Sequence, residues 1–160
     1  MALSKKHEVK AFTFKRQYPQ WLFPGKTQYE AGGKSELFAE RVLDTLNPVS
    51  YYLTAKKIEA FKPDALVFRY WSPFFAIPFG VVARLLREKT RVLSIVDNVF
   101  PHENFPFSRI LTRFFFRHID GFLIMSEAVK KDLLKLVPHA KYTYHPHPVY
   151  SHFGELIDIK

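Results

Sequence analysis

The stretch Arg91-Val-Leu-Ser-Ile-Val-Asp-Asn98 decides the fold, because a β-rich apolar run stops at two polar side chains. The pattern returns at Gly121-Phe-Leu-Ile-Met-Ser-Glu127, with a helical stretch over 107–118 before it and another over 128–136 after it. Strands that alternate with helices predict a parallel sheet. Ligands of such sheets bind beyond the carboxyl ends of the strands. We therefore expect the polar residues after each strand to form the functional edge.

The rest of the chain alternates in the same way. Further strands are predicted over 9–14, 65–69 and 141–145, and helices over 37–46, 51–61 and 78–89. Asn47-Pro48 is expected to end the first of these helices, and Ser50 to cap the next one. Residues 15–35 have no period and predict a long loop. The expected fold class is α/β, a three-layer Rossmann-like parallel sheet with helices on both faces.

Composition limits the possible classes of protein. The 160 residues suit one domain, and 48% hydrophobic content excludes a disordered chain. No apolar run approaches the ~20 residues of a membrane-spanning helix. A formal charge of +9 predicts an anionic partner, and the absence of cysteine fits a reducing compartment. We expect a cytoplasmic location.

Three short motifs resemble parts of known binding sites, but the other residues that those sites need are missing. Gly25-Lys26-Thr27 and Gly33-Lys34-Ser35 match the end of a phosphate-binding P-loop, but Gln20 and Gln28 stand where that loop needs its first glycine. His145-Pro146-His147 offers two imidazoles, whereas a metal site needs three or four ligands. We predict no metal site and no nucleotide hydrolysis.

Four motifs together resemble a known family. They are Lys62-Pro63-Asp64, Asp97-Asn-Val-Phe-Pro-His-Glu103, Met125-Ser-Glu-Ala-Val129 and His145-Pro-His-Pro148. With the loop Gln17–Tyr29, the chain resembles the N-terminal half of bacterial GT-B fold glycosyltransferases of the large group called family 4.

The resemblance implies an enzyme that transfers a sugar from a nucleotide-sugar to a saccharide or lipid-linked acceptor, in cell-surface glycan synthesis. Residues 1–150 would form the acceptor-side, Rossmann-like domain, without the family's first strand-loop-helix unit. Residues 151–160 would begin the linker to the donor domain. We therefore expect a fragment that is inactive alone, needs no metal or other cofactor, and meets the nucleotide-sugar only as donor substrate.

Candidate catalytic residues lie after the strand that ends at Val96. His102 would orient or deprotonate an acceptor hydroxyl or bond the donor sugar, and it would otherwise cap the next helix. Asp97 is a candidate base, but Asp97 and Asn98 would more simply order the loop by bonding backbone amides. Glu103 joins them as a candidate substrate contact.

Other candidate substrate contacts follow the neighbouring strands. Ser126 would contact substrate or cap the next helix, where Glu127 favours the helix dipole. Tyr70 and Trp71 would stack a sugar ring or pack in the core. Three loop residues complete the acceptor candidates: Lys26, Gln28 and Tyr29.

Arg109, Arg113 and Arg117 recur every four residues and form a stripe on a predicted helix. Such a stripe is usually solvated. Together with Phe115 or Phe116, it would suit an anionic membrane surface, which would make the protein peripheral at the inner face of the membrane.

Two other classes of protein stay open. The basic charge and many aromatic residues also fit a nucleic-acid-binding module, although no recognition motif is present. A non-catalytic interaction domain is the remaining alternative.

Overall fold

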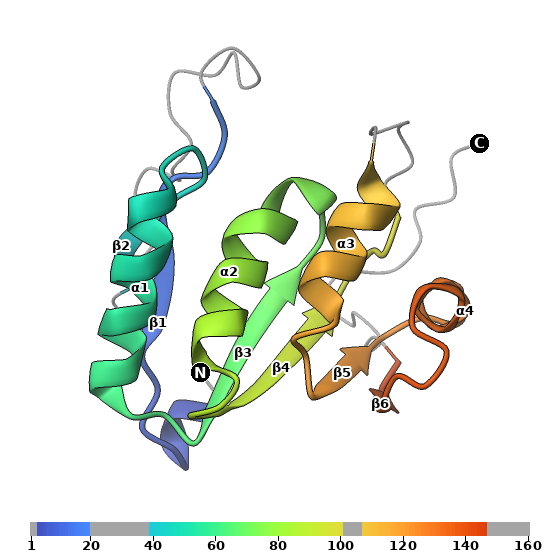
Figure 1. Ribbon diagram of the computed structural model, residues 1–160. Helices are drawn as coiled ribbons and strands as arrows, with labels where there is room; N and C mark the ends of the chain where they lie inside the picture. Colours follow the sequence, from blue (N-terminus) through green and yellow to red (C-terminus); the bar gives the residue numbers. More distant parts are fainter. Residues whose placement is uncertain (1–2, 20–38, 101–106, 147–160) are drawn as a thin grey trace, which may run out of the picture.

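The computed structural model describes residues 3–19, 39–100 and 107–146 (Figure 1). These residues form an α/β fold of alternating strands and helices. In chain order the elements are η1 (Leu3–Lys5), β1 (Ala11–Arg16), β2 (Ala39–Asp44), α1 (Pro48–Phe61), β3 (Ala65–Tyr70), η2 (Pro73–Phe75), α2 (Ala76–Leu86), β4 (Arg91–Val96), α3 (Ser108–Phe116), β5 (Gly121–Ile124), α4 (Glu127–Leu136) and β6 (Tyr142–Tyr144).

All described strands pair in parallel, as the alternation predicted. One sheet has the order β3-β4-β5-β6, and a separate sheet pairs β1 with β2. The four-stranded sheet has an uninterrupted register, whereas the β1–β2 pairing shifts between Thr13 and Phe14 and again before Arg16. Figure 1 places β1 between β2 and the four-stranded sheet.

Helices α2, α3 and α4 contact the same face of the four-stranded sheet. Phe79 of α2 packs on Phe68 at 5.0 Å between ring centroids, and Phe116 of α3 packs on Phe122 at 5.0 Å. Lys130 of α4 lies over the rings of Tyr142 and Tyr144. The register puts these aromatic residues on one face, because Phe68, Ser94, Phe122 and Tyr142 are successive partners. A second helix layer on the opposite face stays a prediction.

Aromatic side chains fill the space between this sheet face and the helices. Phe115 is fully buried and contacts the rings of Phe68, Tyr70 and Phe79. Gly80 lets α3 approach α2, because a Cβ there would lie 2.4 Å from a ring carbon of Phe114. The core therefore depends on large rings from the strands and on one small residue between the helices.

The predicted helix over 37–46 is wrong, because residues 39–44 form strand β2. Its few apolar residues fit a helical spacing, but β1 provides a parallel partner for the backbone. Arg16 donates to both carboxylate oxygens of Asp44 at 2.8 Å, which fastens the carboxyl ends of the two strands. A short apolar run cannot distinguish a helix from a strand, and here tertiary pairing decides.

Asn47-Pro48 begins helix α1 and does not end a helix. The Asn47 side chain accepts from the Val49 amide, and Pro48 occupies the first helical turn, where its missing N–H costs nothing. Asn47, and not Ser50, is therefore the N-cap. Ser50 instead bonds the backbone of Asp44 and joins β2 to α1.

Within the described ranges, no helix is long and apolar enough to cross a membrane. The longest, α1, has 14 residues.

Candidate functional site

The carboxyl ends of the four parallel strands meet at one edge of the sheet. Tyr70 pairs with Val96, Val96 with Ile124, and Ile124 with Tyr144. The residues that follow these partners therefore stand side by side, in the order Trp71, Asp97, Met125 and His145. The structure thus places the predicted candidates Trp71 and Asp97 side by side after β3 and β4, and Ser126 lies one residue beyond Met125 after β5.

Trp71 and Tyr70 have different surroundings. Tyr70 is fully buried, its hydroxyl lies 2.8 Å from Thr112 Oγ1, and burial raises the pKa of its phenol. Tyr70 is therefore a core residue with no ring face available for a sugar. Trp71 is half-buried and packs against Phe75 at 4.6 Å, so only part of its indole remains at the edge.

Asp97 is held at the edge by two contacts. Its amide donates to the Tyr70 carbonyl at 2.9 Å, which extends the β3–β4 pairing by one residue. Its carboxylate accepts from Arg69 Nε at 2.8 Å, and the arginine side chain is largely exposed. An ion pair this open to water is weak, so a competing polar group could replace it. Asn98 beside it is exposed.

Ser126 caps helix α4. Its hydroxyl accepts from the Val129 amide at 3.2 Å, and Glu127 lies in the first turn with its carboxylate paired to Lys130. The capping role expected from the sequence is therefore present. Glu127 is exposed, and its charge is partly neutralised by Lys130. Substrate contact by Ser126 or Glu127 stays a prediction.

Five predicted site residues lie outside the described residues. They are His102, Glu103, Lys26, Gln28 and Tyr29. The segment that carries His102 and Glu103 follows Phe100, four residues after the end of β4.

The arginine stripe lies on α3 and is exposed, as predicted. Arg109, Arg113 and Arg117 all reach solvent, and Arg109 and Arg117 also lie over the rings of Phe100 and Phe114. Phe115 and Phe116 were expected to accompany them, but both are buried against the sheet. The exposed apolar residues of this helix are instead Phe107 and Ile110.

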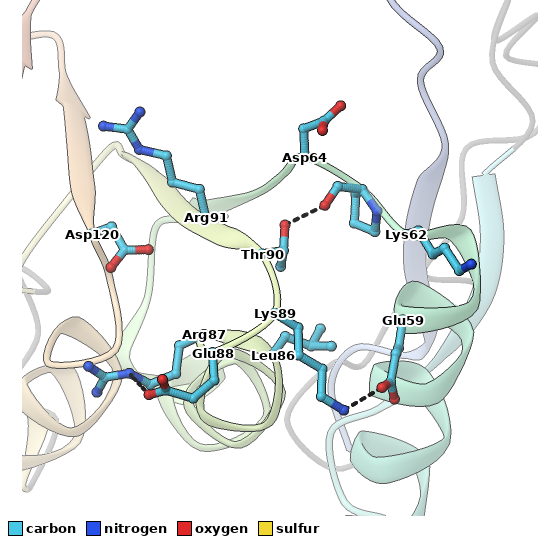
Figure 2. Close-up of a pocket in the computed structure, with 11 residues that line it drawn as sticks. Glu59, Lys62, Asp64, Leu86, Arg87, Glu88, Lys89, Thr90, Arg91 and Asp120 are labelled. Atoms are coloured by element: carbon cyan, nitrogen blue, oxygen red, sulfur yellow. Dashed lines mark hydrogen bonds and ion pairs between the residues drawn. The ribbon is translucent and has the colours of Figure 1, made fainter.

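Sequence reasoning missed an open pocket of about 790 Å³ at the opposite edge, where the strands begin (Figure 2). It lies between the end of α1, the end of α2 and the starts of β3, β4 and β5. Its lining residues are Glu59, Lys62, Pro63, Asp64, Leu86, Arg87, Glu88, Lys89, Thr90, Arg91 and Asp120.

Several polar groups of this pocket are bonded to one another or to the backbone. Lys89 pairs with Glu59, Arg87 pairs with Glu88, and the Thr90 hydroxyl donates to the Pro63 carbonyl at 2.6 Å. Asp120 accepts from the Val92 amide at 2.7 Å. The lining holds four acidic and four basic side chains. These bonds join α1 and α2 to the strands, so the pocket is a structural junction more than a ligand site.

The Lys62-Pro63-Asp64 turn was the one sequence signal for this region. Lys62 ends α1 in the left-handed region at φ 51°, a conformation that directs the chain into β3. The turn has a structural explanation that does not need a ligand.

Across the described part of the chain, no group of three or more His, Cys, Asp or Glu side chains could hold a metal ion. Comparisons with protein-family models, curated proteins and solved structures found no match to this chain.

Proposed function

We propose that this chain is the acceptor-side domain of a glycosyltransferase of the GT-B type, which transfers a sugar from a nucleotide-sugar to a saccharide or lipid-linked acceptor. The carboxyl edge of the four-stranded sheet would form the floor of the acceptor site. The observation that carries the proposal is the placement of Trp71 and Asp97 side by side after β3 and β4, with Ser126 at the start of α4 after the adjacent strand β5. Ligands of open α/β sheets bind at this edge.

The strand order supports a Rossmann-like sheet. In the doubly wound order 3-2-1-4-5-6, the first strand lies between the second and the fourth. Here the order is β2-β1 in one sheet and β3-β4-β5-β6 in the other, with β1 on the side toward β3 (Figure 1). One strand between β1 and β3 would give the doubly wound order with a seventh strand, β6, at its edge, as the resemblance implies.

The chemistry of the edge suits sugar recognition. Glycosyl transfer needs fixed hydrogen-bonding groups around the reacting sugar and positive charge or helix N-termini near the phosphates. Asp97 supplies a carboxylate and Trp71 supplies the edge of an indole. Ser126 is the N-cap of α4, so the N-terminus of that helix also lies at this edge. His102 would complete the site as the group that orients or deprotonates the acceptor hydroxyl.

Amide chemical-shift mapping by NMR tests the proposal. Acceptor saccharides, UDP-sugars and GDP-sugars are titrated into the protein, and the expected shifts lie at residues 71–72, 97–98 and 125–127. Asp97→Asn should weaken saccharide binding, and Asp64→Asn at the opposite edge is the matched control that should not. Shifts confined to residues 62–64 and 87–91 would contradict the proposal.

A nucleic-acid-binding module is the alternative, and the same titration separates it. Single-stranded oligonucleotides should give no saturable binding. Tight binding of an oligonucleotide, weakening steeply with added salt, would replace the transferase proposal, because such dependence reports phosphate neutralisation by many basic groups.

A further inference from the structure

Helices α1, α2 and α3 lie side by side on one side of the strands and form a continuous outer layer (Figure 1). Each helix turns its buried residues inward, so its exposed residues face away from the sheet. We call this outer surface the helix-layer face. Its residues are Val49, Tyr52, Leu53 and Lys56 of α1, Ile77, Val81, Arg84 and Leu85 of α2, and Ile110, Arg113 and Phe114 of α3, with Phe107 directly before α3 and Arg117 directly after it.

Each helix contributes a single stripe to this face. Counted from the first member of each stripe, the others follow after three, four, seven or eight residues, which is the spacing of one side of an α-helix. Phe114 of α3 covers the buried Gly80 of α2, next to Val81, and α2 packs against α1 on its other side. The three stripes therefore lie on adjacent, packed helices.

The helix-layer face exposes several large apolar side chains. Ile110 is 68% exposed, Leu53 54%, Ile77 47% and Leu85 41%. Phe107 is 72% exposed and has a left-handed backbone at φ 61°, an unfavourable conformation for an aromatic residue. Large apolar groups gathered on one face indicate a partner that removes them from water.

The charged side chains that α2 and α3 contribute to this face are all positive. Neither α2 nor α3 contains an acidic residue, and Arg84, Arg113 and Arg117 stand among their exposed apolar groups. Arg84 and Arg117 are both close to His118, whose pKa is lowered by burial and then by Arg117, Arg87 and Arg84. On α1, Lys56 is paired with Glu59. The positive charge is thus concentrated over α2 and α3.

We propose that the helix-layer face docks onto an anionic lipid bilayer. Arginines would meet the lipid phosphates, while the aliphatic side chains between them would enter the boundary between headgroups and acyl chains. Nucleic acid fits this face less well, because Ile77, Leu85 and Ile110 offer neither hydrogen bonds to phosphate nor rings for base stacking. The proposal does not depend on the proposed transferase function.

Sedimentation with vesicles tests the docking. The wild-type protein should sediment with vesicles of phosphatidylcholine and phosphatidylglycerol and much less with phosphatidylcholine alone. The triple variant Arg84→Gln, Arg113→Gln, Arg117→Gln should bind the anionic vesicles roughly 100-fold more weakly, from about 1 kcal/mol for each basic residue near the membrane. The triple variant Ile77→Gln, Leu85→Gln, Ile110→Gln should also bind roughly 100-fold more weakly, because each half-exposed aliphatic side chain loses about 1 kcal/mol of burial.

A matched variant separates this face from net charge. Arg91→Gln, Lys131→Gln and Lys141→Gln remove the same charge from exposed positions outside the helix-layer face, and binding should stay close to that of the wild type. Far-UV circular dichroism checks that every variant is folded. Equal losses in the two charge variants would overturn the proposal, as would oligonucleotide binding that the face variants abolish while vesicle binding is unchanged.

Discussion

The two faces of the four-stranded sheet are built from alternate residues of the same strands, yet their packing differs. On the face toward the helices, Tyr70, Val96 and Ile124 are fully buried. On the opposite face Val67 is 51% exposed, and Ile95 and Leu123 are half-buried. The described helices that contact this sheet cover the first face and leave the second without a helix.

Strand order explains the difference. The order β3-β4-β5-β6 rises steadily, and right-handed crossovers then place every connecting helix on the same side. A helix layer on the other face requires the strand order to reverse, so that some connections cross the sheet in the opposite direction. Burial of the first face is thus a consequence of the described topology, whereas burial of the second requires a further element. Variants on the two faces test this asymmetry.

The largest expected effect comes from Phe115, which packs between the sheet and α2. Phe115→Ala should lower the free energy of unfolding by about 3–5 kcal/mol, because it leaves a cavity among several rings. Ile95→Ala on the opposite face should cost only about 1–2 kcal/mol, because that side chain already meets water. Urea unfolding measures both. Equal costs would mean that the second face is as well packed as the first.

The next effect concerns the one hydrogen bond between Tyr70 and α3. Tyr70→Phe should cost about 1–2 kcal/mol, because it leaves the buried Thr112 hydroxyl without its tyrosine partner. Thr112→Val in the same background should then cost little more, and the double-mutant cycle gives the energy of the pair. Additive costs for the two single changes would show that the two hydroxyls are not coupled.

These strands are also where the sequence was most informative. The runs at 65–69, 91–96 and 121–125 were predicted as strands and lie at β3, β4 and β5. These runs have the length of a strand, and each contains β-branched or aromatic residues, which favour a strand. The alternation of strands with helices also predicted coverage of both faces, because it shows that a helix connects successive strands but not on which face that helix lies.

The incorrect predictions have causes in tertiary pairing or in ambiguous local sequence. Residues 39–44 carry too few apolar side chains to choose a period, and only pairing with β1 makes them a strand. Asn47-Pro48 fits both the end of one helix and the start of another, and the chain uses it as a start. At the candidate site, Ser126 was correctly predicted as a cap, whereas the packing of Tyr70 against Thr112 could not be read from neighbouring residues.

A third effect lies at the rim of the helix layer, where His118 sits beneath Arg117 and Arg87. Burial and the adjacent arginines lower the pKa of His118 in the fold, so the unfolded chain takes up the proton first as pH falls. The stability of the wild type should therefore decrease below the ordinary histidine pKa of 6.5. Urea unfolding across this range should show a shallower acid loss for His118→Gln. Identical slopes would contradict the assignment.

The smallest effect should have the opposite sign. Ser94 lies on the helix-covered face between Phe68 and Phe122, and its buried hydroxyl has no hydrogen-bond partner among the described residues. Removing an unsatisfied polar group recovers its desolvation cost, and the change from serine to alanine leaves only a small space. Ser94→Ala should therefore raise the free energy of unfolding by up to about 1 kcal/mol in urea unfolding.

Thr54→Val is the matched test away from the sheet. Thr54 of α1 also has a buried hydroxyl with no hydrogen-bond partner in the described part of the chain, and valine keeps its shape. If both changes stabilise the protein, the helix-covered face tolerates polar groups only at a cost, as its dense packing implies. If Ser94→Ala destabilises the protein while Thr54→Val does not, the Ser94 hydroxyl has a hydrogen-bond partner outside the described residues. The helix-covered face would then include a satisfied polar group among its aromatic side chains.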